Sequence, residues 1–469
     1  MSAYASKVLA HRPVWLTRLL NGPSPVAVVI VAAVVAGGLH GGFTDLFVYQ
    51  QAGRTVLAAP SAIGSVDPVT GLTFTYPPFA AVVMVPLALL PAWLAAAVWT
   101  GASVGALAAV VVLVRRAMDR PTPGWLAAAV TGFALALEPV WQNLAFGQIN
   151  AFLMVAVLFD VLRPDRRWSG VLLGLAAGVK LTPLVLVVLL VLVGRRATAG
   201  RAVLAFAVTV AVGFLAAPGW AASYWTDGLV DAGRVGPPAL AHNQSVYGAL
   251  TRMLDGRPPT LLWLAVAVPL SVAILVVGSR WWRRGDRVLG TCLTAAAMLV
   301  ASPISWSHHW VWTVPVALVL WERSRWAAAV WAAVFVARPV LWPPWGQRRE
   351  YAWGPYEHLV GNAYLLAALA LSVWATVALV YCPVSPSMHS RSRSAWPQWR
   401  AYSSIMWTRT SRRLIGFLGS RLTRSRDSAA ATKASPFATS SRHRAHASST
   451  TKSSPVASVK SASRSSSRR

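Results

Sequence analysis

The chain has 469 residues, of which 56% are hydrophobic and only 12% are charged, and its formal net charge is +29. Soluble globular proteins carry about 25% charged residues, so the composition excludes an ordinary soluble protein. Several continuously apolar runs, such as residues 93–114, 261–278 and 359–381, approach or exceed the roughly 20 residues that cross a bilayer as a helix. Because these runs do not alternate between apolar and polar residues, they favour helices over a membrane β-barrel. We therefore expect an all-α, polytopic membrane protein.

The first apolar run covers residues 25–39, and Asp45 follows it within a few positions. A carboxylate at the mouth of a membrane span is energetically costly unless water or chemistry uses it. The same segment carries Tyr49 and Gln50, and Tyr76 follows further along the chain. This grouping indicates a membrane-embedded enzyme with a catalytic acid or base just outside its first helix. The alternative is a helix N-cap, because Asp before an apolar helical stretch is a good cap.

Two later segments do not divide into spans of ordinary length. Residues 79–114 are too many for one span and too few for two. Residues 168–193 must enter and leave the membrane on the same side, although the segment is short. We predict short or re-entrant helices there, with Lys180 and Pro183 near the turn, because broken helices are tolerated where they line a polar cavity. The whole chain is predicted to contain roughly 10–13 spans of about 20 residues each.

Clusters of arginine alternate with polar segments along the chain. Short loops rich in Arg mark the cytoplasmic side of a membrane protein, so the polar segments are expected together on the extracytoplasmic side. The arginine clusters lie at residues 12–18, 115–120, 163–167, 195–201, 280–287 and 323–325. The polar segments are residues 45–78, 138–150, 180–183, 218–259, 302–309 and 338–358.

The end of the chain differs from the rest in composition. Residues 383–469 hold 17 Lys or Arg and a single acidic residue, and they are rich in Ser with few aliphatic residues. Such a segment cannot bury enough apolar surface to fold, so we predict a disordered basic tail. Contact with anionic lipid head groups and translation out of frame stay open as alternatives, and nucleic-acid binding is the least favoured. We predict three parts: a cytoplasmic N-terminal segment (1–24), a membrane domain (25–382) and this tail (383–469).

Six motifs follow one another in the polar segments. They are Asp45 with Tyr49, Tyr76-Pro77-Pro78, Gly147-Gln148-Ile149-Asn150, residues 174–183, His242-Asn243-Gln244-Ser245 and residues 302–309. In this order they resemble glycosyltransferase family 87. The resemblance implies the C-type membrane glycosyltransferase fold and an actinobacterial α-mannosyltransferase that uses polyprenyl-phosphate mannose. Members of the family build phosphatidylinositol mannosides, lipomannan and lipoarabinomannan. The family carries an essential aspartate in its first extracytoplasmic loop, and Asp45 is the matching position.

The residue types agree with the reaction that the resemblance implies. Transfer from a β-linked mannosyl phosphate to give an α-mannoside inverts the anomeric carbon, and one base must take the acceptor proton. The leaving group is already a phosphate, so the second carboxylic acid of an inverting hydrolase is not required. We therefore expect Asp45 to be the catalytic base.

His308 and His309 are further catalytic candidates. A His titrates near working pH and can relay a proton or hold the leaving phosphate. The alternative is an interfacial His pair at the head-group level, and the sequence prefers neither His. Adjacent residues do not share a helix face, so this pair is poor metal spacing. We expect no protein-bound metal and no cofactor.

Basic residues on the same expected side are candidates for the donor phosphate. Lys180 is a lone cation in a membrane segment, and the following Thr182-Pro183 indicates a helix break beside it. The alternative is a Lys that snorkels to the interface. Arg54 and Arg252 are further candidates because Arg can bind phosphate with two parallel hydrogen bonds, and Arg234 lies on the same expected side.

Side-chain amides are candidates for the sugars, because sugar hydroxyls need partners that both donate and accept hydrogen bonds. The alternative for each amide is a local turn or cap. The residues expected to bind the sugar or the acceptor are Tyr49, Tyr76, Gln148, Asn150, Asn243 and Gln244.

The leading hypothesis is a multi-pass enzyme of the cell membrane with an extracytoplasmic active site. It transfers mannose from polyprenyl-phosphate mannose to a mannosylated lipid or lipoglycan, with inversion and formation of an α-1,2 linkage. Its partners are the donor, the acceptor and membrane lipids, without nucleic acid. The alternative is a transporter or flippase of a lipid-linked sugar, although the sequence shows no clear internal repeat of the kind that transporters often contain.

Overall fold

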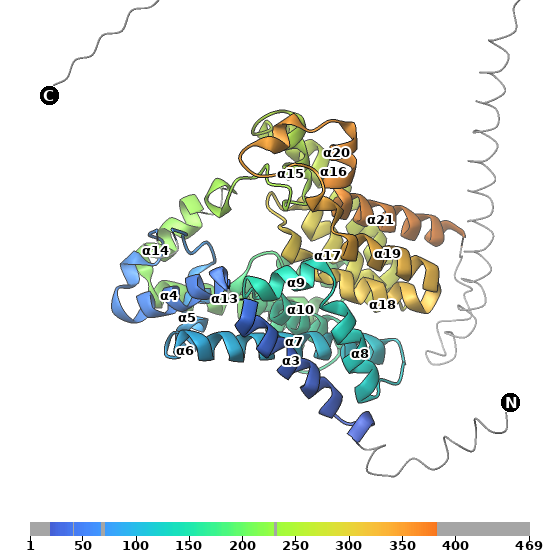
Figure 1. The fold of residues 1–469 in the computed structure, drawn as a ribbon, viewed down its shortest axis with the longest axis horizontal. Helices are drawn as coiled ribbons and strands as arrows, with labels where there is room; N and C mark the ends of the chain where they lie inside the picture. Colours follow the sequence, from blue (N-terminus) through green and yellow to red (C-terminus); the bar gives the residue numbers. More distant parts are fainter. Residues whose placement is uncertain (1–18, 41, 67–70, 229–231, 382–469) are drawn as a thin grey trace, which may run out of the picture. The chain divides into compact units, whose positions relative to one another are not determined.

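The computed structural model of the chain describes residues 19–40, 42–66, 71–228 and 232–381 (Figure 1). The predicted tail, residues 383–469, lies outside the described residues, as do residues 1–18 of the predicted N-terminal segment. The division of the chain into three parts therefore stays a prediction.

The described part of the chain is helical, which confirms the all-α prediction. Within it the extended pairing is limited to two isolated β-bridges, Val66 with Thr73 and Asn243 with Trp306. The α-helices are α3 (Ser24–His40), α4 (Thr44–Ala58), α5 (Pro78–Val83), α6 (Val85–Ala88), α7 (Ala92–Ala117), α8 (Gly124–Ala134), α9 (Glu138–Ala145), α10 (Asn150–Val161), α11 (Val171–Val179), α12 (Leu184–Leu192), α13 (Arg196–Ala216), α14 (Pro218–Ser223), α15 (Val246–Met253), α16 (Thr260–Arg283), α17 (Arg287–Ala301), α18 (Thr313–Arg323), α19 (Arg325–Ala337), α20 (Pro355–Gly361) and α21 (Ala363–Tyr381). Short helices of other types are η1 (Pro60–Ala62), η2 (Tyr224–Gly228), η3 (Ala232–Val235), η4 (Ser307–Trp312), η5 (Pro339–Leu341) and η6 (Arg349–Ala352).

Four helices of the described residues are long and apolar enough to cross a membrane, namely α7, α13, α16 and α21. A fifth candidate is the pair α8 and α9, which bend by 84° at the break between them. The three apolar runs noted in the sequence fall on α7, α16 and α21, although Asn362 interrupts the last run before α21 begins. The number of candidates is lower than the predicted count of roughly 10–13 spans. The difference arises because much of the apolar sequence forms helices that are too short to span a bilayer alone.

Both segments of unusual length contain short helices, as predicted. Residues 79–114 form α5 and α6 before α7 continues as one long helix. Residues 168–193 form α11 and α12, with a break between them. Lys180 has an extended backbone, with φ −150° and ψ 124°, and so ends α11. Pro183 then precedes the first residue of α12, in keeping with the inability of proline to continue a preceding helix.

The break is held in place because α11 packs very close to α13. A Cβ atom at Gly174 would lie 2.3 Å from the Ala202 carbonyl oxygen, and one at Gly178 would lie 2.1 Å from Thr209 Oγ1. A larger residue cannot fit such contacts without moving the backbone. The close packing therefore fixes where α11 ends and where Lys180 lies.

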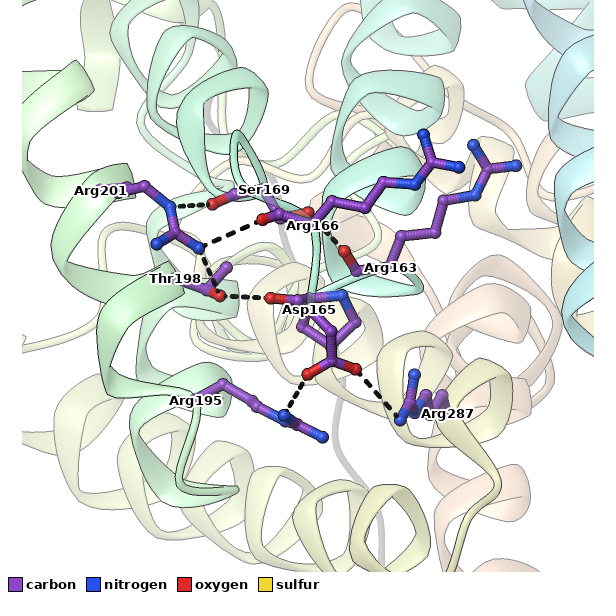
Figure 2. A network of polar contacts seen from close by, with 9 residues as sticks. Arg163, Asp165, Arg166, Ser169, Arg195, Thr198, Arg201 and Arg287 are labelled. Atoms are coloured by element: carbon purple, nitrogen blue, oxygen red, sulfur yellow. Dashed lines mark hydrogen bonds and ion pairs between the residues drawn. The ribbon is translucent and has the colours of Figure 1, made fainter. Parts of the chain in front are cut away.

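Ion pairs join arginine clusters that are far apart in the sequence. We call the region that they occupy the arginine-rich end. The proximity agrees with the prediction that these clusters share one side of the molecule. The pairs are Asp165 with Arg195 and Arg287 (Figure 2), Glu322 with Arg115 and Arg120, and Asp286 with Arg323.

Candidate active site

Five of the six polar segments meet around one cavity of about 570 Å³. This convergence is what the alternation of polar segments and arginine clusters predicts. The sixth segment reaches the cavity wall indirectly, because the Trp345 ring packs edge-on against the ring of His242 at 5.2 Å. The chemically active side chains that line the cavity are Asp45, Tyr49, Tyr76, Gln148, Lys180, Thr182, Tyr224, Arg234, His242, Trp306, His308 and His309.

Backbone hydrogen bonds place Asp45 in the cavity wall. The N–H groups of Asp45 and Leu46 donate to the Phe146 carbonyl at 3.0 and 3.2 Å. These bonds tie the start of α4 to the end of α9. Asp45 is the second residue of α4, and the N-cap position is Phe43, which has φ 53° and no side-chain cap. The N-cap alternative for Asp45 is therefore wrong, and its carboxylate is directed to the cavity instead.

The carboxylate of Asp45 is half-buried, and burial raises its pKa above the ordinary value. A hydrogen bond with the Gln148 side chain and the positive charge of Lys180 oppose this rise. A carboxylate with a raised pKa holds a proton more readily at neutral pH than an exposed one. This is the property that a general base needs.

Two tyrosines orient Gln148 toward Asp45. The hydroxyls of Tyr49 and Tyr76 lie 2.8 Å apart, and each lies 3.1 Å from Gln148 Oε1. The carbonyl side of the Gln148 amide is thus occupied by the tyrosines. Its NH₂ group remains for the carboxylate of Asp45. Tyr49, Tyr76 and Gln148 all line the cavity, as the prediction of sugar-binding residues requires.

Lys180 points into the cavity from the break between α11 and α12. Its Nζ atom donates to Asn150 Oδ1 at 3.0 Å and lies 2.9 Å from His309 Nε2. It also lies 5.5 Å from the centre of the Tyr76 ring. Lys180 makes no ion pair with Asp45 or with any other carboxylate of the described residues. The site therefore contains a cation and a carboxylate that face one space without neutralising each other.

The two adjacent histidines have different surroundings, which the sequence did not distinguish. An ammonium can only donate, so the contact between Lys180 and His309 requires an unprotonated Nε2 on His309. His308 is buried against the Phe146 ring, and its Nε2 has no hydrogen-bond partner among the described residues. His309 thus positions Lys180, and His308 presents an unused ring nitrogen at the cavity wall.

Asn150 does not line the main cavity, contrary to its predicted contact with sugar. Its Nδ2 donates to the backbone carbonyl of His308 at 3.2 Å, and its Oδ1 accepts from Lys180. Asn150 therefore positions two cavity residues.

Asn243 and Gln244 do not line the cavity, so the structure does not support their predicted role in sugar binding. Both are fully buried. Asn243 donates to the Pro303 carbonyl at 3.1 Å and accepts from the Ser305 N–H. Gln244 donates to the Gly361 carbonyl at 2.7 Å. These amides satisfy backbone groups of buried loops, which is the local role that was kept as the alternative.

Arg252 and Arg54 also lie outside the cavity, so the structure does not support their predicted contact with the donor phosphate. Arg252 is 1% exposed, and its guanidinium donates to the carbonyls of Ala239, Leu240 and Asn243. Arg54 is exposed and lines a separate pocket. It lies about two and a half turns after Asp45 on the same helix, which places it on the opposite face.

Several cavity residues, among them Tyr224, His242 and Trp306, were not selected from the sequence, which named Arg234 only as a cation on the same expected side. Arg234 donates to the Thr75 carbonyl at 3.0 Å, and its guanidinium lies 5.0 Å from the Tyr224 ring. His242 and Trp306 complete this part of the wall. His242 and Trp306 both belong to motifs noted in the sequence, and this membership was the available signal for their presence in the cavity. Burial lowers the pKa of His242, so it is neutral at physiological pH.

Among the described residues, no three His, Cys, Asp or Glu side chains gather closely enough to hold a metal ion. The polar groups of the cavity are instead one carboxylate, two cations, neutral imidazoles, amides and tyrosine hydroxyls. This set can take a proton from a hydroxyl, bind a phosphate and bind sugar hydroxyls. The absence of a catalytic metal stays a prediction.

Comparisons with known proteins point to one family. The model named glycosyltransferase family 87 matches residues 74–303. A polyprenol-phosphate-mannose-dependent alpha-(1-2)-phosphatidylinositol pentamannoside mannosyltransferase of Mycobacterium tuberculosis is 37% identical over an alignment of 374 residues, with 73% of this chain and 83% of that protein covered. The protein of the same description from Mycolicibacterium smegmatis is 33% identical over 71% of this chain and 84% of its own length.

A second kind of relative is similar to the same extent. A polyprenol-phosphate-mannose-dependent alpha-(1-2)-phosphatidylinositol mannoside mannosyltransferase of Mycobacterium tuberculosis is 34% identical over 70% of this chain and 83% of that protein. No solved structure matches the chain.

Proposed function

The chain belongs to glycosyltransferase family 87, and from this premise we propose that it transfers mannose from polyprenyl-phosphate mannose to a phosphatidylinositol mannoside. The product carries a new α-1,2 linkage. The names of the relatives support the donor, the acceptor class and the linkage. The observation that carries the chemistry is the unpaired Asp45 and Lys180 facing one cavity.

Asp45 acts as the general base. Its carboxylate takes the proton of the acceptor hydroxyl as that oxygen forms a bond to the anomeric carbon of the donor mannose. The bond from the anomeric carbon to the phosphate oxygen breaks on the opposite face, and its electron pair stays with the polyprenyl phosphate. The configuration therefore inverts from β to α. The leaving phosphate needs no proton, so a single carboxylate suffices.

Lys180 binds the donor phosphate and stabilises its growing negative charge. A charge that develops in the transition state is best met by a cation that is already fixed in position. His309, Asn150 and Tyr76 hold Lys180 in this way. The polyprenyl chain of the donor lies in the bilayer beside the broken helices α11 and α12. His308 offers a second polar contact to the phosphate through its unused Nε2.

The remaining wall of the cavity takes the acceptor. Trp306, Tyr76 and Tyr224 provide aromatic surfaces for the apolar faces of sugar rings. Arg234 provides a cation at the same wall. Gln148 and the tyrosine hydroxyls offer hydrogen bonds for the mannose hydroxyls. The positive-inside rule supports an extracytoplasmic cavity, with the arginine-rich end in the cytoplasm.

A transfer assay with the purified full chain tests this function. The protein in lipid nanodiscs is given labelled polyprenyl-phosphate mannose and phosphatidylinositol mannosides of increasing mannose number. The expected product gains one mannose in an α-1,2 linkage, as determined by methylation analysis and α-mannosidase digestion. Transfer to lipoglycan acceptors but not to phosphatidylinositol mannosides would overturn the acceptor assignment.

A second assay distinguishes the enzyme from a flippase. The full chain is placed in vesicles that hold labelled donor in one leaflet. Movement of the donor between leaflets without glycosidic transfer would overturn the enzymatic proposal. Lipid analysis of a strain that lacks the chain provides a second check, because the proposal predicts loss of α-1,2-mannose from the mannosides.

A further inference from the structure

The loop between α10 and α11 is fixed by side chains that bind its backbone carbonyl groups. Thr198 Oγ1 donates to the Pro164 carbonyl at 2.7 Å. Arg201 Nε donates to the Ser169 carbonyl at 2.7 Å (Figure 2). The Ser169 hydroxyl in turn donates to the carbonyl of Arg163. A loop held at so many points keeps its backbone in one conformation, which fixes the positions from which its charged side chains project.

Three charged side chains of this loop, Asp165, Arg163 and Arg166, divide into two groups that point apart. The carboxylate of Asp165 faces Arg195 and Arg287 and pairs with both. Figure 2 shows that the side chains of Arg163 and Arg166 extend together in the other direction, away from Asp165. The one carboxylate of the loop is therefore used elsewhere, and the two arginines are left without it.

A third arginine completes this cluster. Arg116, in the last turn of α7, lies close enough to Arg163 to act on its charge. Burial, then the charges of Arg166 and Arg116, lower the pKa of the Arg163 guanidinium. Among the described residues none of the three makes an ion pair, and Asp119 on the adjoining turn makes none either. Three neighbouring cations repel one another unless an anion lies between them.

We propose that Arg163 and Arg166, with Arg116 adding positive charge, bind the phosphate of an anionic phospholipid head group at the arginine-rich end. Guanidinium groups bind phosphate oxygens with parallel hydrogen bonds, and two of them project side by side from a fixed loop. The site lies at the end of the spanning helix α7, so it is within reach of a membrane surface.

A further observation favours a lipid over other anions. Trp168, next to this cluster in the loop, is 70% exposed, and the guanidinium of Arg167 stacks on its ring at 5.3 Å. Exposed Trp with a neighbouring cation is typical of the membrane interface. The chain's own terminal segment is excluded as the occupant by charge, because residues 383–469 hold 17 Lys or Arg and one acidic residue.

Lipid binding by the full chain tests the proposal without depending on the transfer reaction. The purified protein is titrated with vesicles of phosphatidylglycerol and of phosphatidylcholine, and retained lipid is identified by native mass spectrometry. The variant Arg163→Gln/Arg166→Gln is expected to bind phosphatidylglycerol roughly tenfold or more weakly, with little change for phosphatidylcholine. Unchanged binding of phosphatidylglycerol by this variant would overturn the proposal.

The matched control removes the same charge from the same end of the molecule. Arg196 and Arg280 are exposed, and Arg196→Gln/Arg280→Gln is expected to retain most of the binding. Equal losses in the two double variants would mean a general charge effect and would overturn the site.

A second variant and a second ligand keep the test decisive. Arg163→Lys/Arg166→Lys keeps the charge but loses the paired hydrogen bonds, so it is expected to bind phosphatidylglycerol more weakly than the wild type. This variant also serves if the Gln variant fails to fold. Inorganic phosphate is expected to compete only weakly with the lipid. Displacement of the lipid by low concentrations of free phosphate would overturn the assignment to a lipid head group.

Discussion

The arginine-rich end and the cavity use charge in opposite ways. All five ion pairs of the described residues lie at the arginine-rich end, where Asp165, Asp286 and Glu322 each meet at least one arginine. In the cavity, Asp45 and Lys180 face the same space and remain unpaired. The carboxylates at the arginine-rich end are therefore paired and join helices, whereas the carboxylate in the cavity is not paired.

The unpaired state of the cavity has an energetic cost, since a partly buried charge without a partner is poorly solvated. The cavity tolerates it because neutral groups stabilise both charges. Gln148 contacts the carboxylate, and Asn150 and His309 contact the ammonium. Neutral partners leave the net charges available for a substrate. Substitutions in the cavity should therefore change the transfer rate, and substitutions at the arginine-rich end should change the stability.

The largest effect is expected for Asp45→Asn. Loss of a general base typically lowers the rate by about 10²–10⁴-fold. The variant should fold normally, because Asn is isosteric and removes the burial cost of the charge. The measurement is kcat for mannose transfer, with thermal unfolding as the control for folding. A kcat near the wild-type value in a folded protein would remove Asp45 from the mechanism.

A smaller loss is expected for Lys180→Met. A charge-assisted hydrogen bond contributes about 1.5–3 kcal/mol, so kcat/KM for the donor should fall roughly 10- to 150-fold. The matched control is Arg54→Gln, which removes a cation from the separate pocket and should leave kcat/KM unchanged. Similar losses in the two variants would mean that the donor phosphate is not bound where Lys180 lies.

The sequence predicts the broken helices and the convergence of polar segments because the constraints behind them hold in any tertiary structure. The segment of residues 168–193 is too short to cross the membrane twice as full helices, and Pro183 cannot continue a preceding helix. A break near Lys180 therefore follows from chain length and covalent geometry. Asp45 is too costly to bury without use. Such constraints act on a single segment and do not depend on its neighbours.

Roles that depend on burial could not be predicted in this way. An amide that can bind sugar can equally satisfy a buried backbone carbonyl, and Asn243 and Gln244 do the second. Arg234 and Arg252 lie in the same polar segment, yet only Arg234 lines the cavity. Arg54 differs, because its position opposite Asp45 follows from helical periodicity alone and was predictable.

The pH dependence of transfer gives a finer test of the cavity. A base must be unprotonated, so kcat/KM should fall as the pH falls through the pKa of Asp45, which burial raises above its ordinary value. Gln148→Leu removes the hydrogen bond that opposes this rise, so the acid limb of the profile should move to higher pH. Tyr49→Phe keeps the Gln148 amide and its second tyrosine partner, Tyr76, so the limb should move less than in Gln148→Leu. An acid limb that stays in place in Gln148→Leu would mean that the limb reports the titration of a group other than Asp45.

The smallest effect is expected at the arginine-rich end, for Asp165→Asn. This side chain is 61% exposed, so water screens its pairs with Arg195 and Arg287. Exposed pairs contribute about 0–1 kcal/mol, and the loss of stability should lie within that range, with unchanged transfer. Asp286→Asn is the comparison, because Asp286 is 13% exposed, pairs with Arg323 and caps α17 by accepting from the Leu289 N–H at 3.0 Å. Asn caps a helix about as well as Asp does, so this substitution keeps the cap and removes the more buried of the ion pairs compared. Thermal unfolding of both variants in one detergent therefore ranks Asp286→Asn below Asp165→Asn in stability, and the reverse order would mean that exposure does not govern the strength of the pairs at this end.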